Sequence, residues 1–437
     1  MIETKPANNI VFLVHYFPPI NSSGAKRVEA MAKYFVQAGR TVTVVTTRKS
    51  AADGAFTELF PTGVNVLELD WLGRVGKSVA GNNAYEPMYT GKPSIKRRIK
   101  GLVMRWFGQL PDPRLPFAFG FLSPFLDPAA RRALRSASII VGSCPPWPML
   151  LAALFAHWRF RKPIVLDYRD HFGDCHEMPG SKRAKFVERY VDKALAIRAD
   201  ALVTISEPMA KYYSQYNQNV TVIMNGYDSD ALAEAKRSCG WRPREEGHSL
   251  VVRYFGIISP GRVPRNFLLA LFKTQQGGRC DVGAVRFEFY GNCAVLENAL
   301  RENYPSLLPM FVFHPAVPYK QALQLMVSSD YLIFSETSSK DSLSAQGILT
   351  TKLFEYIGSG RPIIADIDPT TLAGSTILAA GNHHFVSDRT EDFEHLLLGE
   401  EFWKPASPIV SSFGMTLSRA LQAQQYLHVL DSHCKGS

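Results

Sequence analysis

The sequence is poor in cysteine and has no long hydrophobic run. Its 437 residues include six cysteines, and none of these is spaced as CxxC or as a metal-binding cluster. We therefore expect reduced thiols with mostly structural roles, as in a cytoplasmic protein. No apolar run approaches the roughly 20 residues that a membrane-spanning helix needs, and no secretory signal precedes the first expected strand. These absences predict a protein that is made and kept in the cytoplasm.

Acidic residues are almost absent from one stretch of an otherwise ordinary composition. The chain is 46% hydrophobic and 20% charged, as globular proteins are, and its formal net charge is +10. Residues 71–111 contain eight lysines or arginines and a single acid, Glu86. At helical spacing this stretch has an apolar face and a basic face. Trp106 and Phe107 fall on the apolar face. The basic residues, which include Arg97, Arg98 and Lys100, fall mostly on the opposite face.

A basic amphipathic helix with aromatic residues on its apolar face suits an anionic membrane surface. A helix that packs on the core and leaves a basic face in water remains an alternative. Nucleic acid is not expected as a partner, because no recognised binding motif accompanies the basic residues. We therefore predict that a helix at 94–110, within an insertion at about 72–130, attaches the protein to the inner face of the cytoplasmic membrane.

The chain also lacks the glycine-rich fingerprint of dinucleotide-binding domains. The strand expected at 9–15 runs into His15-Tyr-Phe-Pro-Pro-Ile-Asn-Ser-Ser-Gly24, a longer loop with a single glycine. A nicotinamide or flavin site of that kind is therefore not expected here. The loop could still bring the backbone N–H groups of Ser23 and Gly24 close to a diphosphate at the start of the next helix.

The remaining pattern predicts two α/β halves. An opening of strand, amphipathic helix and β-branched strand favours a parallel sheet covered by helices. A polar, charged stretch at 228–248 looks like a linker, and we place the domain boundary between residues 235 and 236. The expected strands are 9–15, 41–47, 139–141, 163–167, 201–205 and 221–224 in the first half, and 250–255, 286–290, 311–314, 331–334 and 362–365 in the second.

Residues 342–365 have the outline of a phosphate-and-ribose site. A loop of small residues opens a helix, which stops at Gly-Ser-Gly before a buried strand. The positive end and free N–H groups of such a helix attract an anion, and the hydroxyls of Thr350 and Thr351 can add hydrogen bonds. Lys352 lies near the helix start, and the Glu355 carboxylate, one turn in, can hold a vicinal diol. An ordinary loop, helix and strand would show the same pattern, so that alternative stays open.

Several motifs follow one another in the order found in one enzyme family. They are Phe17-Pro-Pro, the Ser-Ser-Gly loop, Tyr254-Phe-Gly with Gly261-Arg262, Phe289-Tyr-Gly291, Val317-Pro318-Tyr319, and Thr351-Lys-Leu-Phe-Glu-Tyr with Gly360-Arg-Pro. Each motif is modest, but the ordered set covers most of the chain and is specific. The sequence resembles retaining glycosyltransferases of the GT-B fold, of the family-4-like group. Within that group it is similar to the capsule, exopolysaccharide and O-antigen branch.

The resemblance implies an α/β architecture, the GT-B fold, in which two Rossmann-like domains with parallel sheets face a cleft. Residues 1–235 would form the acceptor-side domain, and residues 236–410 would bind the nucleotide-sugar. A C-terminal helix within 411–437, where leucines and alanines recur at helical spacing, would return to the first domain.

Roles for individual residues also follow from the resemblance. Glu355 would bind the ribose, and Arg262 would neutralise the leaving nucleoside diphosphate, with Lys352 sharing that work. These cations would replace a metal, so we expect neither a metal nor another cofactor, only the nucleotide-diphosphate sugar as substrate. The remaining donor contacts would come from Ser23, Gly24, Val317, Gly347, Leu349, Thr350 and Thr351.

Two features of the family are missing from this chain. Many members carry a glutamate eight residues before the ribose-binding one, where this chain has Gly347 beside Gln346. Backbone groups at 347–349 would contact the sugar instead. Many members also place a histidine near the reacting carbon, but the corresponding loop, Gly142-Ser-Cys-Pro-Pro146, has none.

The nearest substitutes for that histidine lie in Leu166-Asp-Tyr-Arg-Asp-His171. These residues follow a buried strand, at the sheet edge where ligand clefts form. We interpret Asp170 or Arg169 as the group that orients the acceptor hydroxyl or the donor sugar. An Asp–Arg pair that only closes the strand end is the alternative.

The sequence therefore predicts a retaining glycosyltransferase that acts in cell-surface polysaccharide biosynthesis. It would move a sugar from a nucleotide-diphosphate donor to a lipid-linked glycan at an anionic membrane surface. Two alternatives remain. One is a nucleotide-sugar epimerase of the same fold, which needs no acceptor and no membrane helix. The other is a catalytically degenerate scaffold subunit of a polysaccharide assembly complex.

Overall fold

The computed structural model describes residues 8–434 with gaps. Left out are residues 21, 50–52, 54–58, 73–111, 113, 114, 116–118, 174–179, 241–248, 279–283, 337–346, 348, 405 and 406, and only the backbone of Ser23 is described. The chain divides into two compact units. The first unit comprises residues 1–224, 342–347 and 420–437, and the second comprises 225–341 and 348–419.

The first unit is built on a parallel sheet whose described strands are ordered β3-β2-β1-β4-β5-β6-β7. The strand order reverses between β1 and β4, and open α/β sheets bind ligands beyond the carboxyl ends of strands at such a switch point. The sequence did not predict β3, which is short and lies at the sheet edge. The strands are β1 Asn9–Val14, β2 Thr41–Thr47, β3 Asn65–Leu69, β4 Ile139–Cys144, β5 Ile164–Tyr168, β6 Ala201–Thr204 and β7 Val220–Val222.

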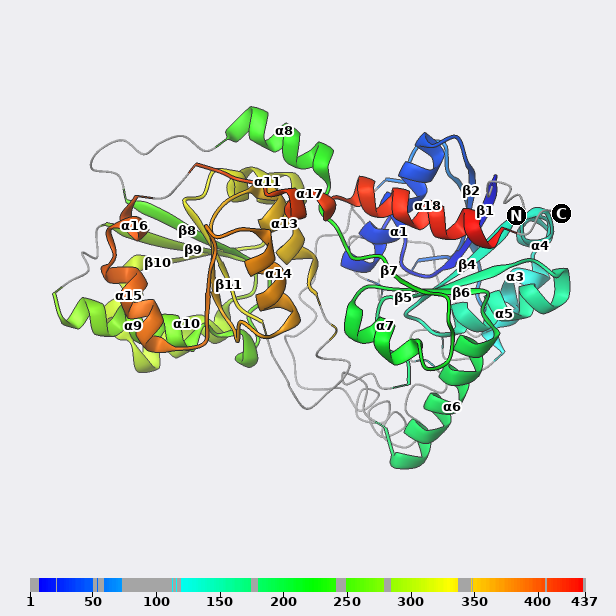
Figure 1. Ribbon diagram of the computed structural model, residues 1–437, viewed down its shortest axis with the longest axis horizontal. Helices are drawn as coiled ribbons and strands as arrows, with labels where there is room; N and C mark the ends of the chain where they lie inside the picture. The colour runs from blue at the N-terminus through cyan, green and yellow to red at the C-terminus, as the bar shows by residue number, and fades with distance from the viewer. Residues whose placement is uncertain are drawn as a thin grey trace. The chain divides into compact units, whose positions relative to one another are not determined.

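Helices cover both faces of this sheet (Figure 1). They are α1 Ser23–Gln37, α3 Ser123–Leu126, α4 Pro128–Ser136, α5 Pro148–Phe160, α6 Lys182–Arg198 and α7 Glu207–Tyr213, with a 3₁₀ turn η2 at Gly120–Leu122. The first helix begins where the Ser22 hydroxyl accepts the Ala25 N–H at 3.2 Å. The chain leaves this helix through Gly39, whose φ of +79° suits glycine.

The last helix, α18 (Arg419–His433), packs on the first unit beside α1 (Figure 1). Its Tyr426 ring lies 5.8 Å from that of Phe35. Asp431 accepts a 2.9 Å bond from Arg40. Residues from the end of the chain thus complete the core on one face of the first sheet, opposite the face that α5 covers.

The second unit has its own parallel sheet, whose described strands are ordered β10-β9-β8-β11-β12-β13. The order again reverses, here between β8 and β11, and the short edge strand β13 was not predicted. The strands are β8 Leu250–Phe255, β9 Val285–Tyr290, β10 Phe311–His314, β11 Tyr331–Phe334, β12 Ile363–Asp366 and β13 Phe385–Ser387. Their apolar side chains and the adjoining helices form one core.

The helices of the second unit begin before its first strand. They are α8 Ser229–Cys239, α9 Arg265–Gln276, α10 Ala294–Asn303, α11 Tyr319–Val327, α13 Thr351–Ser359, α14 Leu372–Ala380, α15 Thr390–Leu398, α16 Glu400–Trp403 and α17 Ser412–Thr416, with 3₁₀ turns η3 Pro260–Arg262 and η4 Pro305–Met310.

The prediction of a linker at 228–248 is wrong for its first half, which forms helix α8. Asp228 caps α8 by accepting the N–H groups of Asp230 and Ala231, and the helix packs against α11. Lys236 also donates to the Gly358 carbonyl at 3.0 Å. The polar composition that suggested a linker is the solvent face of a short amphipathic helix, with Leu232 and Ala235 buried.

None of the described helices is both long enough and apolar enough to cross a membrane. The predicted basic amphipathic helix, with Arg97, Arg98, Lys100, Trp106 and Phe107, lies outside the described residues. Its membrane role stays a prediction.

Candidate active site

The start of α13 has hydrogen-bonding groups that lack a partner among the described residues. Thr350 is the N-cap residue, but its side chain makes no capping bond. Its Oγ1 is buried and has no hydrogen-bond partner in the described part of the chain. The first N–H groups of a helix also lack intrahelical partners, and the helix dipole makes this end positive. Leu349 is buried just before the cap, so the chain enters the helix from the core.

Lys352, in the first turn of α13, is held against aromatic rings. Its Nζ donates to the Tyr254 hydroxyl at 2.7 Å and lies 4.3 Å from the centre of that ring. The Phe334 ring centre is 5.3 Å away. Burial lowers the pKa of Lys352 to about 8, with Glu336 opposing the shift and Arg262 adding to it. The ammonium group therefore changes charge just above neutral pH.

Arg262 lies beside the same lysine. It ends η3, which follows β8, and its Nε donates to Glu336 Oε1. The second oxygen of that carboxylate, Oε2, is buried, and none of the residues that the structure describes bonds to it. Two cations and one incompletely bonded carboxylate thus meet at the carboxyl edge of the second sheet.

Sequence reasoning missed Glu336. A usable signal existed, because the residue comes two positions after β11, at the edge where the parallel strands end. The same rule led to Asp170 in the first half.

Two glycines allow the chain segments after β8 and β9 to approach each other closely at this sheet edge. Gly256 and Gly291 follow β8 and β9 with φ values of +123° and +128°. A side chain at Gly291 would collide with the Gly256 carbonyl, so only glycine allows this backbone approach. Beyond β10, on the same edge, Val317 is half-buried in the loop before α11. The predicted donor contact Val317 therefore lies on the same edge as Arg262.

Glu355 already has partners within the protein. The carboxylate lies 3.8 Å from the guanidinium of Arg419. Burial raises the pKa of the Tyr319 hydroxyl, and the charge of Glu355 and a hydrogen bond to it raise it further. A ribose would have to share this carboxylate with Tyr319 and Arg419. The ribose role of Glu355 stays a prediction.

In the first unit, Arg169 joins the start of α1 to the loop after β4, and its predicted role stays a prediction. Its Nη1 donates to the Gly24 carbonyl at 2.7 Å and its Nη2 to the Pro145 carbonyl at 2.6 Å. A side chain at Gly24 would collide with this guanidinium. Burial lowers the pKa of Arg169, against the raising effect of Asp167 and Asp170. Asp170 itself is exposed.

A buried ion pair beneath that clamp was also missed by sequence reasoning. Arg27 of α1 and Asp167 of β5 are both almost fully buried, with an Nη2–Oδ1 distance of 3.1 Å. Ser143 donates to the second oxygen of Asp167 at 3.0 Å, and Arg27 also donates to the Met224 carbonyl. Nothing in the local pattern of α1 marks Arg27 as a core residue, because its partners come from distant strands.

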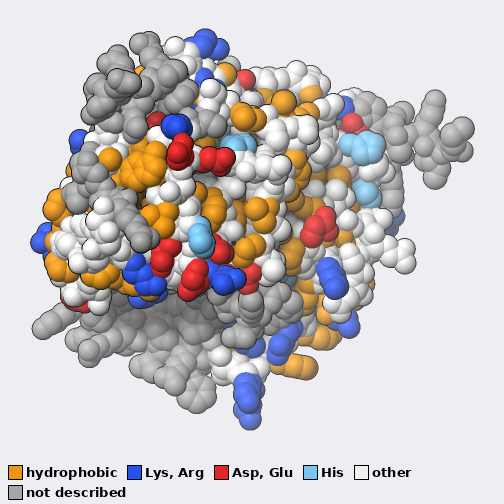
Figure 2. Space-filling view, turned by 60° about the vertical axis from the view of Figure 1, so that its left-hand side comes forward, with side chains coloured by type: hydrophobic (Ala, Val, Ile, Leu, Met, Phe, Trp, Pro, Cys, Tyr) orange, Lys and Arg blue, Asp and Glu red, His pale blue; other side chains and the backbone are white. Residues whose placement is uncertain are grey.

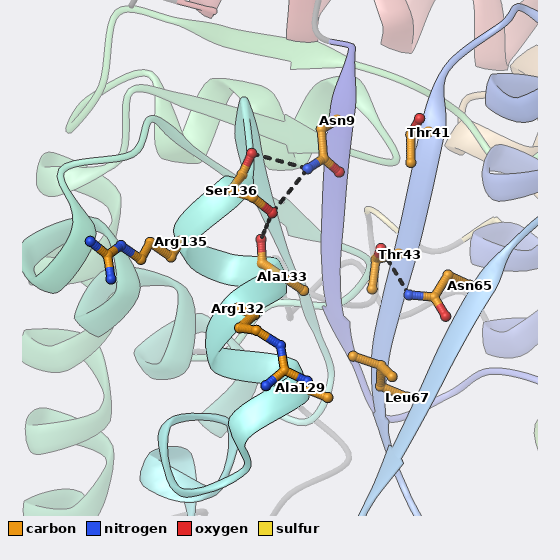
Figure 3. Close-up of a pocket in the computed structure, with 10 residues that line it drawn as sticks. All are labelled: Asn9, Thr41, Thr43, Asn65, Leu67, Ala129, Arg132, Ala133, Arg135 and Ser136. Carbon is orange, nitrogen blue, oxygen red and sulfur yellow. Dashed lines mark hydrogen bonds between the residues drawn. The ribbon is translucent and has the colours of Figure 1, made fainter.

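An open groove of about 720 Å³ lies far from these groups within the first unit (Figure 3). Asn9, Thr41 and Asn65 line it and are the first residues of β1, β2 and β3. The groove is therefore at the amino ends of these strands, opposite the edge that carries Arg169. Asn9 bonds to Ser136 of α4 across one end of it.

The predicted site residues fall into two groups. The second unit brings together Arg262, Lys352, Glu355, Val317, Leu349, Thr350 and Thr351, whereas Ser23, Gly24, Arg169, Asp170 and the buried Gly347 belong to the first unit. Among the residues that can be described, no cluster of three or more His, Cys, Asp or Glu side chains could hold a metal ion. The absence of a metal requirement stays a prediction.

Comparison with known proteins gives one family match, which covers slightly less than half of the chain. Residues 24–226 match the model described as "Glycosyl transferase 4-like domain". A search of curated proteins returns no match.

Solved structures match over almost the whole chain. A glycosyltransferase from Rickettsia africae ESF-5 is 13% identical, with a TM-score of 0.58 over 99% of this chain and 100% of that one. Sucrose-phosphate synthase from Thermosynechococcus elongatus is 13% identical, with a TM-score of 0.56 over 97% and 96% of the two chains.

A lipopolysaccharide outer core galactosyltransferase, WaaB, is 11% identical, with a TM-score of 0.55 over 97% and 99%. At such identities the likeness is one of fold. The fold prediction is confirmed, and the family match together with the two parallel sheets supports a glycosyltransferase of the GT-B fold.

Proposed function

We propose that the protein transfers a sugar from a nucleotide-diphosphate sugar to a lipid-linked glycan, with retention of the anomeric configuration, in cell-surface polysaccharide biosynthesis. The supporting observation is the group formed by Arg262, Lys352 and the uncapped start of α13 with Thr350. Two cations and unused hydrogen-bond donors at a helix start are the groups that bind a diphosphate.

In the proposed reaction the bond from the sugar C1 to the diphosphate breaks as the acceptor oxygen bonds to C1. The acceptor proton passes to the departing phosphate oxygen, so no protein base is needed. Arg262 and Lys352 stabilise the charge that develops on the diphosphate. Retention rests on the resemblance of the ordered motifs to retaining enzymes.

Two likenesses support a lipid-linked acceptor. One structural neighbour is a lipopolysaccharide galactosyltransferase, and the motifs of this chain resemble the branch that builds surface polysaccharides. We extend that class of acceptor to this protein and place it on the inner face of the cytoplasmic membrane.

Nucleotide titration tests the donor half of the proposal. Thermal unfolding is followed with UDP, GDP, ADP, CMP and dTDP, because a ligand that binds the native state raises the apparent stability. We expect one nucleoside diphosphate to raise the unfolding temperature of the wild type and to have little effect on Arg262→Ala. No shift with any nucleotide would contradict the donor site.

Turnover is then measured with sugars of the nucleotide that binds, using lipid-linked acceptors. The anomeric configuration of the product, read by NMR, tests retention. Donor binding without transfer to any acceptor would favour a scaffold subunit, and conversion of the donor sugar without an acceptor would favour an epimerase.

A further inference from the structure

Helix α6 of the first unit exposes large hydrophobic side chains. Phe186 and Tyr190 are 68% and 69% exposed, and Val187 and Ile197 are about half exposed at 46% and 52%. Phe186, Tyr190 and Ile197 are four and seven positions apart, a spacing that places them along one side of a helix, and Val187 lies beside them. A surface helix normally shows polar residues to water, so this hydrophobic strip needs a partner.

The charges of α6 are divided by sign between its two sides. Its only acids, Glu188 and Asp192, are buried. Glu188 accepts a 2.9 Å bond from Lys185, and Asp192 accepts the Gly173 N–H and the Tyr213 hydroxyl. The exposed residues of the helix include five basic ones, Lys182, Arg183, Arg189, Lys193 and Arg198. The outer surface of α6 is therefore hydrophobic and basic.

The hydrophobic strip does not arise from a loosely packed helix. Leu195 and Ala196 are buried in the core of the first unit, and Asp192 is tied to Tyr213 of α7. Figure 2 shows basic and hydrophobic side chains together at its lower edge, the end at which Figure 1 places α6. The helix is anchored by one face and presents the other to solvent.

We propose that the outer surface of α6 docks on an anionic lipid bilayer, with Phe186, Val187, Tyr190 and Ile197 entering the headgroup region. Charge complementarity favours a bilayer over a second copy of this chain, because two such surfaces would bring their basic residues together. Aromatic and aliphatic residues flanked by lysine and arginine are the pattern of a helix that lies in the membrane interface.

This surface is separate from the predicted membrane segment at 94–110, and it does not depend on the proposed transfer reaction. It would form a second point of attachment on the first unit. Two membrane-binding segments together can hold a protein stably on a bilayer when each segment alone binds weakly.

Vesicle sedimentation of the full chain tests the proposal. The probes are vesicles of phosphatidylcholine alone and of phosphatidylcholine with phosphatidylglycerol, at low and high salt. We expect the wild type to sediment with the anionic vesicles at low salt only. Two variants carry changes on α6: the apolar triple Phe186→Ser, Val187→Ser, Tyr190→Ser, and the charge triple Lys182→Glu, Arg183→Glu, Lys193→Glu. Each should weaken binding by at least about tenfold.

Matched controls separate α6 from general effects of charge and polarity. Arg131→Glu, Arg132→Glu, Arg135→Glu makes the same change in charge on exposed residues of α4 in the same unit. Leu378→Ser with Met415→Ser removes exposed apolar side chains from the second unit. Both controls should bind like the wild type, and all variants should keep the wild-type unfolding temperature.

Several outcomes would overturn the proposal. One is that the wild type does not sediment with anionic vesicles. Another is that both α6 variants bind normally while Arg97→Glu, Arg98→Glu, Lys100→Glu loses binding, which would leave attachment to the 94–110 segment alone. A third is that the apolar α6 variant abolishes self-association, measured by analytical ultracentrifugation, without affecting vesicle binding. The strip would then be an interface between copies.

Discussion

The carboxyl edges of the two sheets carry similar residue types, but these residues differ in their hydrogen-bond partners. In the first unit, Asp167 has Arg27 and Ser143 as partners, and Arg169 spans two backbone carbonyls. In the second unit, Thr350 Oγ1 and Glu336 Oε2 are buried without a partner in the part of the chain that is described. Buried polar atoms normally have partners, so the two that lack one near Lys352 and the start of α13 are candidates for ligand contact.

This difference predicts which charged groups stabilise the fold and which bind a ligand. The buried charged groups Arg27 and Asp167 of the first unit have partners within the protein, so their loss should act mainly on folding. Those of the second unit retain bonding capacity and include a lysine with a lowered pKa, so their loss should act mainly on ligands. Four predictions test that division, in order of decreasing expected effect.

The largest effect is expected from Asp167→Ala in the first unit. The change leaves Arg27 buried without its carboxylate and should lower the free energy of unfolding by about 3–5 kcal/mol. Urea denaturation measures the loss. The control is Asp431→Ala, which breaks the more exposed Arg40–Asp431 pair and should cost at most about 1 kcal/mol. If the two variants lose the same free energy of unfolding, the buried pair does not stabilise the fold more than the exposed pair.

In the second unit, Arg262→Ala should reduce kcat by about 10²–10³-fold, because a donor to the developing diphosphate charge is lost. The free energy of unfolding should change less than in Asp167→Ala, since Arg262 is partly exposed and Lys352 remains near Glu336. Arg265→Ala, an exposed arginine at the start of α9, serves as the control. Near-normal turnover by the Arg262 variant would refute the donor site.

The pH dependence of donor binding tests Lys352. Because its pKa is lowered to about 8, the ammonium form is present below that pH and is lost as the pH rises through it. Donor affinity should therefore be highest below pH 8 and fall above it, by at most about tenfold per pH unit. Calorimetric titration of the nucleotide against pH measures this dependence.

Lys352→Arg should retain its charge and lose the fall in affinity between pH 8 and pH 9. If the wild type binds the nucleotide equally well at both values, Lys352 does not contact the phosphates in its charged form.

The smallest effect is expected from Thr350→Val. The hydroxyl has no described protein partner, so its removal should leave the free energy of unfolding unchanged or slightly higher. Loss of one hydrogen bond to the ligand should weaken nucleotide binding by about 3–10-fold. Thr351→Val, next to it on the helix, is the comparison variant. A loss of stability without a loss of binding would make Thr350 a structural cap.

Much of the fold could be predicted because strands and helices are encoded locally. The β-branched run 41–47 is β2 with the predicted bounds, and 250–255 is β8. The errors occurred where the local pattern is ambiguous. Strand β3 is short and half-exposed, and the polar face of α8 suggested a linker. Tertiary packing on α11 decides that α8 is a helix.

The candidate site could be predicted only in part. The start of α13 is a local feature, and its residues were identified together. Glu336 and Arg27 were missed because their partners lie 74 and 140 residues away along the chain. Arg169 was identified, but its bonds to the Gly24 and Pro145 carbonyls could not be foreseen.

The sequence by itself determined the alternation of strands and helices and the helix start at Thr350, since both depend on neighbouring residues and their periodicity. Only the tertiary structure decided which polar groups are satisfied. Asp167 and Glu336 both lie where a strand ends, and no local pattern separates them. The strand order and the packing of α1 give Asp167 an arginine and a serine, whereas one oxygen of Glu336 has no partner among the described residues. A buried oxygen without a partner costs free energy unless a ligand binds it, so this difference makes Glu336, and not Asp167, a candidate for ligand contact.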